Sequence, residues 1–156
     1  MVLKNIALAA LISLISTSAF AQSAKPAAKK PAVVYHQFVV TRVKDGDTFV
    51  IDTNAYRFLP ELEFSVRVYG IDTPEKGAAA KCPREAALAV QASAYGKQLI
   101  AETNNLVLLS RVKHDKYGGR FDATVTLSDG SDYAQRMIAK GLAYPYFGGT
   151  KQSWCQ

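Results

Sequence analysis

Residues 62–75 read LEFSVRVYGIDTPE, and the rest of the chain can be organised around this segment. Apolar and polar side chains alternate in its first half, where Arg67 lies between Val66 and Val68. Alternation with a period of two predicts a half-buried β-strand, which we place from about Leu62 to Gly70. Arg67 then points to the face opposite the apolar side chains, so its guanidinium need not enter the core.

A pair of segments with strand character lies on either side of this strand. Residues 33–43 and 48–52 are rich in β-branched and aromatic side chains and flank the turn-forming tetrad KDGD (residues 44–47), which predicts a hairpin. Residues 106–113 and 121–127 have the same character and flank a second polar, glycine-containing turn. The sequence therefore predicts five short strands.

Two helices are predicted between and after these strands. Pro83, a residue favoured in the first helical turn, begins a helix that we expect to run to about Thr103. Its apolar stripe at helical spacing predicts core packing and consists of Leu88, Ala92, Tyr95 and Leu99. A shorter helix is predicted from Asp132, with Gln135 as its capping partner, to Gly141.

The predicted order is three strands, a helix, two strands and a helix. Five short strands with a helix between the third and the fourth are typical of a small closed Greek-key barrel of the oligonucleotide-binding (OB) type, so we predict a mainly β fold with helices (α+β). The chain has 156 residues, 49% hydrophobic and 21% charged, which indicates one globular domain and excludes a disordered, collagen-like or coiled-coil protein.

The first 21 residues are typical of a secretory signal peptide. Lys4 precedes an apolar run over residues 6–15, and small residues surround the predicted cleavage site after Ala21. The run is shorter than the roughly 20 apolar residues of a membrane-spanning helix, although an uncleaved anchor remains an alternative. We expect a flexible basic linker over residues 22–32, a folded domain over residues 33–156, and export to the periplasm or the extracellular medium without membrane attachment after cleavage.

The charge balance gives a weak indication of the partner. Nineteen lysines and arginines against 13 aspartates and glutamates give a net charge of +6, which becomes +5 when residues 1–21 are removed. An excess of this size is compatible with a polyanionic partner but does not establish one. We expect Lys140 and Lys151 to be solvated surface charges.

The two cysteines, Cys82 and Cys155, are too few for a disulfide-dense scaffold or a four-cysteine zinc site. In an oxidising compartment they are expected to form a disulfide, with two free thiols as the alternative. His36 and His114 fit no metal-ligand pattern, and we expect them at the surface or at strand edges.

Three carboxylates lie in two loops at strand ends. Asp47 belongs to the first turn, and Asp72 and Glu75 follow the central strand. If the three converge, their repulsion is best relieved by a hard cation such as Ca²⁺; taken singly, each is also a common turn-forming residue. Arg67 and Arg120 favour the first interpretation, because two guanidiniums opposite a metal can grip one phosphodiester from both sides.

Four segments in this order resemble the staphylococcal nuclease (thermonuclease) family: KDGDT at 44–48, VRVYGIDTPE at 66–75, DKYGGR at 115–120 and GLA at 141–143. The likeness covers about residues 39–146. It implies a Ca²⁺-dependent phosphodiesterase, an endonuclease on an OB barrel that hydrolyses RNA and single-stranded or melted DNA; another divalent cation could replace Ca²⁺. We expect a monomer.

The resemblance also implies residue roles around the metal. Asp47 and Asp72 would be carboxylate ligands, and the main-chain carbonyl of Thr73 would be a further ligand. Glu75 would be the general base that orients or deprotonates the attacking water.

The substrate-facing residues come from the same resemblance. Arg67 and Arg120 would hold the scissile phosphate, while Lys116 and Tyr117 would lie near the nucleotide. Gly119 lengthens the turn before Arg120 by one residue relative to the family pattern, so the role of Arg120 depends on where this extra residue is accommodated.

Two tyrosines after the second helix have two interpretations. Tyr144 and Tyr146 could stack on a base, which is a sequence-tolerant way to hold a single strand, or they could pack the C-terminal tail on the barrel. Two other classes of protein also remain open: a non-catalytic OB module that binds single-stranded nucleic acid, and a barrel that binds an anionic ligand or a protein. The enzyme is preferred because the paired aspartates and Glu75 are present together.

Overall fold

The computed structural model describes residues 32–53 and 63–156. The predicted signal peptide (1–21), nearly all of the predicted linker (22–32) and the first residue of the predicted central strand therefore lie outside the described residues.

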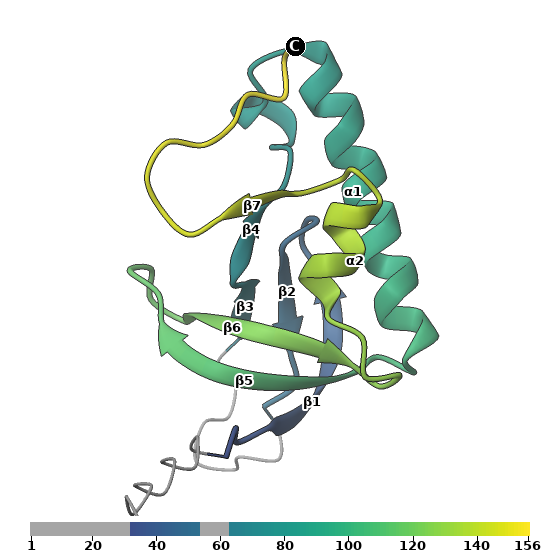
Figure 1. Cartoon of the computed structure of the whole chain (residues 1–156), viewed down its shortest axis with the longest axis vertical. Helices are drawn as coiled ribbons and strands as arrows, with labels where there is room; N and C mark the ends of the chain where they lie inside the picture. The colour runs from purple at the N-terminus through teal and green to yellow at the C-terminus, as the bar shows by residue number, and fades with distance from the viewer. Residues whose placement is uncertain (1–31, 54–62) are drawn as a thin grey trace, which may run out of the picture. The chain divides into compact units, whose positions relative to one another are not determined.

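Within the described residues, five strands close into a barrel in the order β1, β2, β3, β6, β5 (Figure 1). Their bounds are His36–Val43 (β1), Thr48–Ile51 (β2), Phe64–Val68 (β3), Leu106–His114 (β5) and Arg120–Leu127 (β6). Neighbouring strands are antiparallel except β3 and β6, which are parallel. This arrangement is the predicted OB barrel, with the long helix between its third and fourth strands.

Both predicted helices are present (Figure 1). Helix α1 spans Pro83–Glu102, and a short 3-10 helix, η1, precedes it at Gly77–Ala79. Helix α2 spans Tyr133–Ala139, and the side chain of its N-cap, Asp132, accepts a hydrogen bond from the Gln135 N–H at 3.0 Å. Helix α1 begins at Pro83, as predicted, and α2 begins after its predicted cap, Asp132, which satisfies an N–H group that has no partner within the helix.

The core combines the inner side chains of the barrel with one face of each helix. Fully buried members are Phe49, Val66, Val68, Leu99, Val107, Leu109, Val125, Leu127, Tyr133 and Met137. The predicted stripe of α1 is confirmed: Ala92 and Leu99 are buried, and Leu88 and Tyr95 pack against the cluster from its edge. Among the described residues, no helix is long and apolar enough to cross a membrane.

The predicted central strand is wrong in its length. It is broken after Val68, and the chain continues as a separate strand, β4 (Gly70–Asp72), which pairs with β7 (Tyr144–Tyr146) in a two-stranded sheet outside the barrel. Gly70 has a φ of +91°, and a Cβ there would lie 3.2 Å from the Phe147 ring, so the change of direction depends on glycine. The alternation is clear only as far as Val68, so periodicity did not define where the strand ends.

Candidate active site

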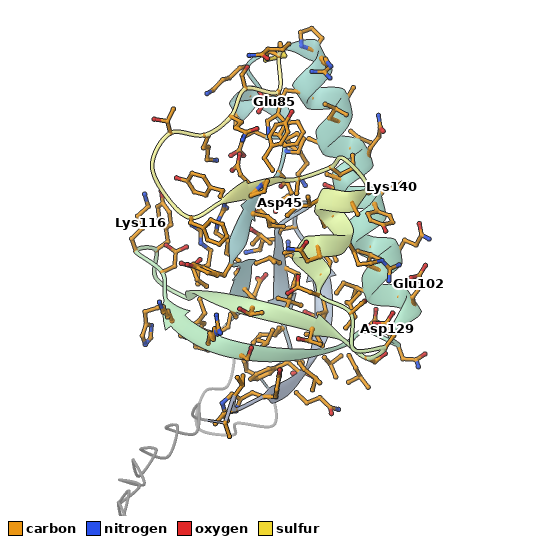
Figure 2. All side chains as sticks on the ribbon, viewed as in Figure 1. Asp45, Glu85, Glu102, Lys116, Asp129 and Lys140 are labelled. Carbon is orange, nitrogen blue, oxygen red and sulfur yellow. A yellow bond between two sulfur atoms is a disulfide. The ribbon has the colours of Figure 1, made fainter. Side chains whose placement is uncertain are left out.

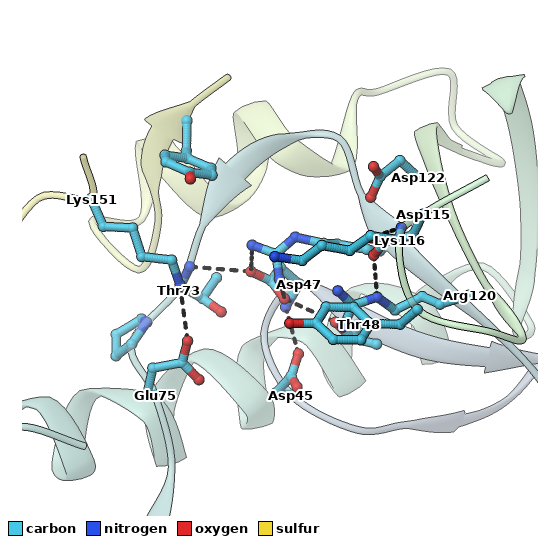
Figure 3. A pocket seen from close by; sticks show the side chains of 14 residues that line it. Asp45, Asp47, Thr48, Thr73, Glu75, Asp115, Lys116, Arg120, Asp122 and Lys151 are labelled. Atoms are coloured by element: carbon cyan, nitrogen blue, oxygen red, sulfur yellow. Dashed lines mark hydrogen bonds and ion pairs between the residues drawn. The ribbon is translucent and has the colours of Figure 1, made fainter. Parts of the chain in front are cut away.

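One pocket gathers most of the predicted site residues (Figure 3). Its volume is about 470 Å³, and its walls come from the β1–β2 turn, β3, the loop after β4, the β5–β6 turn and the C-terminal segment. The predicted residues that line it are Asp47, Arg67, Thr73, Glu75, Lys116, Tyr117, Arg120 and Tyr146. The barrel thus brings together segments that lie far apart in the sequence.

Asp47 is held in the turn between β1 and β2. Its carboxylate accepts hydrogen bonds from Thr48 Oγ1 at 3.0 Å and from the Thr73 main-chain N–H at 3.3 Å, and the residue is 4% exposed. Burial raises the pKa of Asp47 to about 7, although the Arg67 guanidinium opposes this shift. A buried carboxylate with a raised pKa is stabilised when it takes up a proton or binds a cation. Such shifted groups are typical of functional sites.

The turn that carries Asp47 is fixed from two sides. A Cβ on Gly46 would lie only 2.9 Å from both Ala92 Cβ and Thr73 Cγ2, so the turn packs at a distance that only glycine allows. From the other side, the buried Tyr133 hydroxyl donates a hydrogen bond to the Gly46 carbonyl at 2.9 Å. Helix α2 therefore helps to position Asp47.

Arg67 on β3 connects two of the predicted carboxylates. Its Nη2 lies 3.1 Å from Asp47 Oδ2 and 3.6 Å from Asp72 Oδ1. The flanking Val66 and Val68 are buried in the core, so Arg67 points to the opposite face, as the alternation predicts. Burial acts to lower the pKa of Arg67, but Asp47 and Asp72 outweigh it and the net shift is upward, so the guanidinium stays charged.

Asp72 is the last residue of β4, and Thr73 and Glu75 lie in the loop that follows it. Asp72 and Thr73 are 3% and 4% exposed, whereas the Glu75 side chain is 47% exposed at the pocket. Asp72 Oδ1 is buried and is held by ion pairs, to Lys151 Nζ at 2.7 Å and to Arg67 Nη2 at 3.6 Å, rather than by a well-aligned hydrogen bond. A buried carboxylate oxygen in this state is a candidate ligand for a cation.

Glu85 holds the loop that carries Glu75, a role that was not predicted from the sequence. Glu85 is 3% exposed in the first turn of α1, and it accepts hydrogen bonds from the Glu75 N–H at 3.3 Å and the Lys81 N–H at 2.7 Å. Figure 2 labels Glu85 at the start of α1, close to where Figure 1 marks the C-terminus. The available signal was a carboxylate three residues after the N-cap, which usually reports capping alone.

Arg120 lies at the first position of β6, opposite Ser65 of β3 in the register of the two strands. Gly119 adopts a φ of +68° and its carbonyl accepts from the Ser65 N–H at 2.8 Å, so the extra residue is accommodated in the turn and Arg120 still lines the pocket. The Arg120 guanidinium pairs with Asp115 and lies 4.4 Å above the Tyr117 ring.

The predicted substrate-binding residues divide into two groups. Tyr117 is 54% exposed with the Lys116 ammonium 5.1 Å from its ring centre, and Tyr146 also lines the pocket. Tyr144 is not among the pocket's lining residues; its ring stacks on Trp154 at 3.9 Å between centroids. This placement favours the packing interpretation for Tyr144.

The expectation that Lys151 is a solvated surface charge is wrong. Its Nζ lies 2.7 Å from Asp72 Oδ1 and 3.0 Å from Glu75 Oε1, inside the pocket (Figure 3). Burial acts to lower the pKa of Lys151, but the attraction of Asp72 and Glu75 is stronger and raises it. Lys140, His36 and His114 are exposed, as expected.

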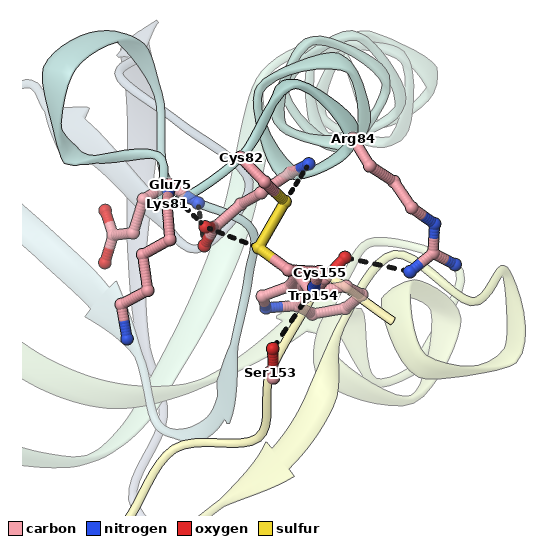
Figure 4. Close-up of a disulfide and its surroundings, with 8 residues drawn as sticks. Glu75, Lys81, Cys82, Arg84, Ser153, Trp154 and Cys155 are labelled. Carbon is pink, nitrogen blue, oxygen red and sulfur yellow. Dashed lines mark hydrogen bonds between the residues drawn. A yellow bond between two sulfur atoms is a disulfide. The ribbon is translucent and has the colours of Figure 1, made fainter.

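The predicted disulfide is present between Cys82 and Cys155 (Figure 4). Cys82 is the N-cap of α1, and Trp154 next to Cys155 is buried, with its carbonyl accepting from Arg84 Nη1 at 2.8 Å. Glu85 lies close to both sulfurs, but sulfurs joined in a disulfide are not thiolates, so this group is not a zinc site.

The fold and the pocket define a class of protein: an OB barrel that gathers carboxylates and guanidiniums at one cavity. Residues 65–154, more than half of the chain, match the family model described as staphylococcal nuclease homologue. The chain belongs to the staphylococcal nuclease family, whose members are generally nucleases that act on nucleic acid. A search of curated proteins found no match.

Proposed function

We propose that the protein is an exported, metal-dependent endonuclease that hydrolyses the phosphodiester bonds of DNA and RNA. The observation that carries the proposal is the convergence of Asp47, Asp72, Glu75 and Arg67, which come from three separate segments and are linked by ion pairs or line one pocket. Family membership supports the reaction class. A secretory leader would deliver the protein to the periplasm or the extracellular medium.

The residues present fit a hard divalent cation. Asp47 and Asp72 offer buried carboxylates, Thr73 offers a main-chain carbonyl, and Asp72 Oδ1 already attracts cationic groups, Lys151 Nζ at 2.7 Å and Arg67 Nη2 at 3.6 Å. All of these donors are oxygens, the ligands that Ca²⁺ prefers. When bound, the cation supplies positive charge that neutralises the phosphate and favours deprotonation of a water molecule.

The two arginines supply the remaining positive charge. Hydrolysis passes through a state in which negative charge grows on the oxygens around phosphorus, and N–H donors aimed at these oxygens stabilise it. Arg67 and Arg120 line the same pocket, and Asp47 and Asp115 orient them through ion pairs. Each guanidinium can present two parallel N–H groups to one phosphate.

Glu75 is the candidate general base. Its side chain is partly exposed at the pocket, so water can reach the carboxylate, and its main chain is anchored to Glu85 on α1. A carboxylate placed in this way can accept the proton of the attacking water.

The proposed substrates are single-stranded or melted DNA and RNA. The exposed ring of Tyr117 and the ring of Tyr146 lie at the pocket, and stacking on such rings tolerates any base. Lys116 lies at the outer tip of the β5–β6 turn, where it can meet a neighbouring phosphate (Figure 2). We propose that the protein acts as a monomer.

The proposal is tested with Glu75→Gln, Arg67→Ala and Arg67→Lys, assayed on single-stranded DNA and on RNA with Ca²⁺ and then with a chelator. The cleavage rate of each variant should fall by a factor of about 10² to 10³, because each lacks a group that acts in the transition state. Lysine should not rescue Arg67, since one ammonium cannot replace a planar fork of donors. Lys97→Ala, on the exposed face of α1, is the matched control.

Binding is monitored in the same samples. Retained binding by Glu75→Gln without cleavage supports the proposal. Chelator-insensitive binding without any cleavage by the wild type would instead identify a non-catalytic OB module.

A further inference from the structure

The segment from Phe147 to Ser153, here called the C-terminal strap, is anchored at both ends. At its start, β7 pairs with β4, and Tyr144 lies opposite Asp72 in that register. At its end, Trp154 is 4% exposed, and Cys155 is bonded to Cys82 at the start of α1 (Figure 4). The strap is therefore fixed at both ends although its own residues are exposed, and of these Lys151 lines the pocket.

Lys151 lies on this strap, three residues before Trp154. Its Nζ lies 2.7 Å from Asp72 Oδ1 and 3.0 Å from Glu75 Oε1, so one ammonium bridges two carboxylates of the candidate site. The side chain is 38% exposed, which leaves it a path into solvent. The main chain of Lys151 is thus fixed, while its ammonium group has room to move into solvent.

A divalent cation on Asp72 competes with this ammonium. Both need the same buried carboxylate oxygen, and like charges a few ångströms apart repel strongly where water is excluded. Arg67 Nη2 lies 3.6 Å from Asp72 Oδ1, farther than Lys151 Nζ at 2.7 Å, so Lys151 competes more directly for this oxygen. Because the Lys151 side chain is partly exposed, its ammonium can move away from Asp72 into solvent.

We propose that Lys151 is a tethered counter-ion of the candidate metal site, which neutralises Asp72 and Glu75 in the metal-free protein and is displaced from Asp72 when a divalent cation binds. Lys151 is in this sense a positioning residue that sets the cation affinity. The inference rests on the proposed function, because it concerns the cation that Asp47 and Asp72 would hold.

The test is a calorimetric titration of the metal-free protein with Ca²⁺ in the absence of nucleic acid. Lys151→Met keeps most of the side-chain length and removes the charge, Lys151→Arg keeps the charge, and Lys97→Met on α1 is the matched surface control. Lys151→Met should bind Ca²⁺ about tenfold more tightly than the wild type, because no charge-assisted contact has to be broken. The arginine and control variants should stay close to the wild type.

A second readout is the melting temperature without metal, which should fall in Lys151→Met relative to Lys97→Met because Asp72 and Glu75 lose their counter-ion. If the methionine variant does not fold, Lys151→Gln replaces it in both measurements. If removal of the lysine charge leaves the Ca²⁺ affinity at the wild-type value or lowers it, the inference is overturned and the proposed function is not. Absence of Ca²⁺ binding in the wild type and in the variants overturns both the inference and the cation of the proposed function, whereas binding that appears only in the variants supports the inference.

Discussion

At the scale of single residues, the position of Asp47 depends on a side chain that never reaches the pocket. The Tyr133 hydroxyl, buried on α2, donates to the Gly46 carbonyl and so joins the helix to the turn that carries the carboxylate. Gly96 on α1 makes room for it, because a Cβ there would overlap the Tyr133 hydroxyl. A phenylalanine would fill the same space but leave the carbonyl without this partner.

We therefore expect Tyr133→Phe to lower the free energy of unfolding by about 1 to 3 kcal/mol, the usual result of leaving a buried polar group unpaired. Urea unfolding of the metal-free protein measures it. Tyr35→Phe, at an exposed tyrosine, is the control and should change little. Equal stability of Tyr133→Phe and the wild type would show that the hydrogen bond does not contribute.

The same residue predicts a response to alkaline pH. Burial, together with the charges of Asp47 and Asp45 and the neighbouring Tyr95, raises the pKa of Tyr133 above the ordinary value of about 10. Above pH 10 the unfolded chain releases this proton while the folded protein keeps it, so stability falls as pH rises. Tyr133→Phe should lose less stability than the wild type between about pH 9 and 11. Parallel stability curves for the two proteins would contradict this.

At the scale of secondary structure elements, the start of α1 connects the C-terminal segment with the loop that carries Glu75. Cys82 caps the helix and is bonded to Cys155, while Glu85 one turn on accepts two main-chain N–H groups from the segment containing Glu75. Pro83 supplies the helical φ that this start requires. One helix end thus positions both the candidate base and the strap that carries Lys151.

Removing the disulfide should measure this connection. The two cysteines are 73 residues apart, and closing so long a loop stabilises the fold by up to about 4 kcal/mol on the chain-entropy model. Cys82→Ser/Cys155→Ser should unfold at correspondingly lower urea concentration than the oxidised wild type. A reducing agent should shift the wild type toward the variant and leave the variant unchanged; no shift in either would rule out the stabilising role.

At the scale of the whole molecule, the described residues that line the pocket of the barrel combine four cationic side chains, Lys151 among them, with five carboxylates. Arg67, Arg120 and Lys116 line it, although the excess positive charge of the whole chain is modest. Nucleic acid should therefore be gripped by a few defined phosphate contacts rather than by a broad basic surface.

The salt dependence of binding tests this view. With three phosphate contacts to a single strand, the logarithm of the binding constant should fall with the logarithm of salt concentration with a slope of about −2, or roughly −0.7 per contact. Glu75→Gln allows the measurement without cleavage, and adding Lys116→Ala should make the slope shallower by about one contact. A slope near zero would exclude phosphate contacts as the source of binding.

The sequence by itself determined the barrel, the two helices and most of the site. Alternation and helical periodicity are local properties, and they place strands, caps and the core face of α1 without any knowledge of the fold. The motifs around Asp47, Arg67 and Asp72 are equally local: Asp47 lies in a turn, Asp72 at a strand end, and the alternation in β3 turns Arg67 away from the core.

Only the tertiary structure decided the break at Gly70, the pairing of β4 with β7 and the roles of Glu85 and Lys151. Each of these depends on contacts between segments that are distant in the chain. A lysine near the C-terminus has no pattern that separates a solvated charge from a counter-ion, because the difference lies in the path that β7 and the disulfide impose on the strap.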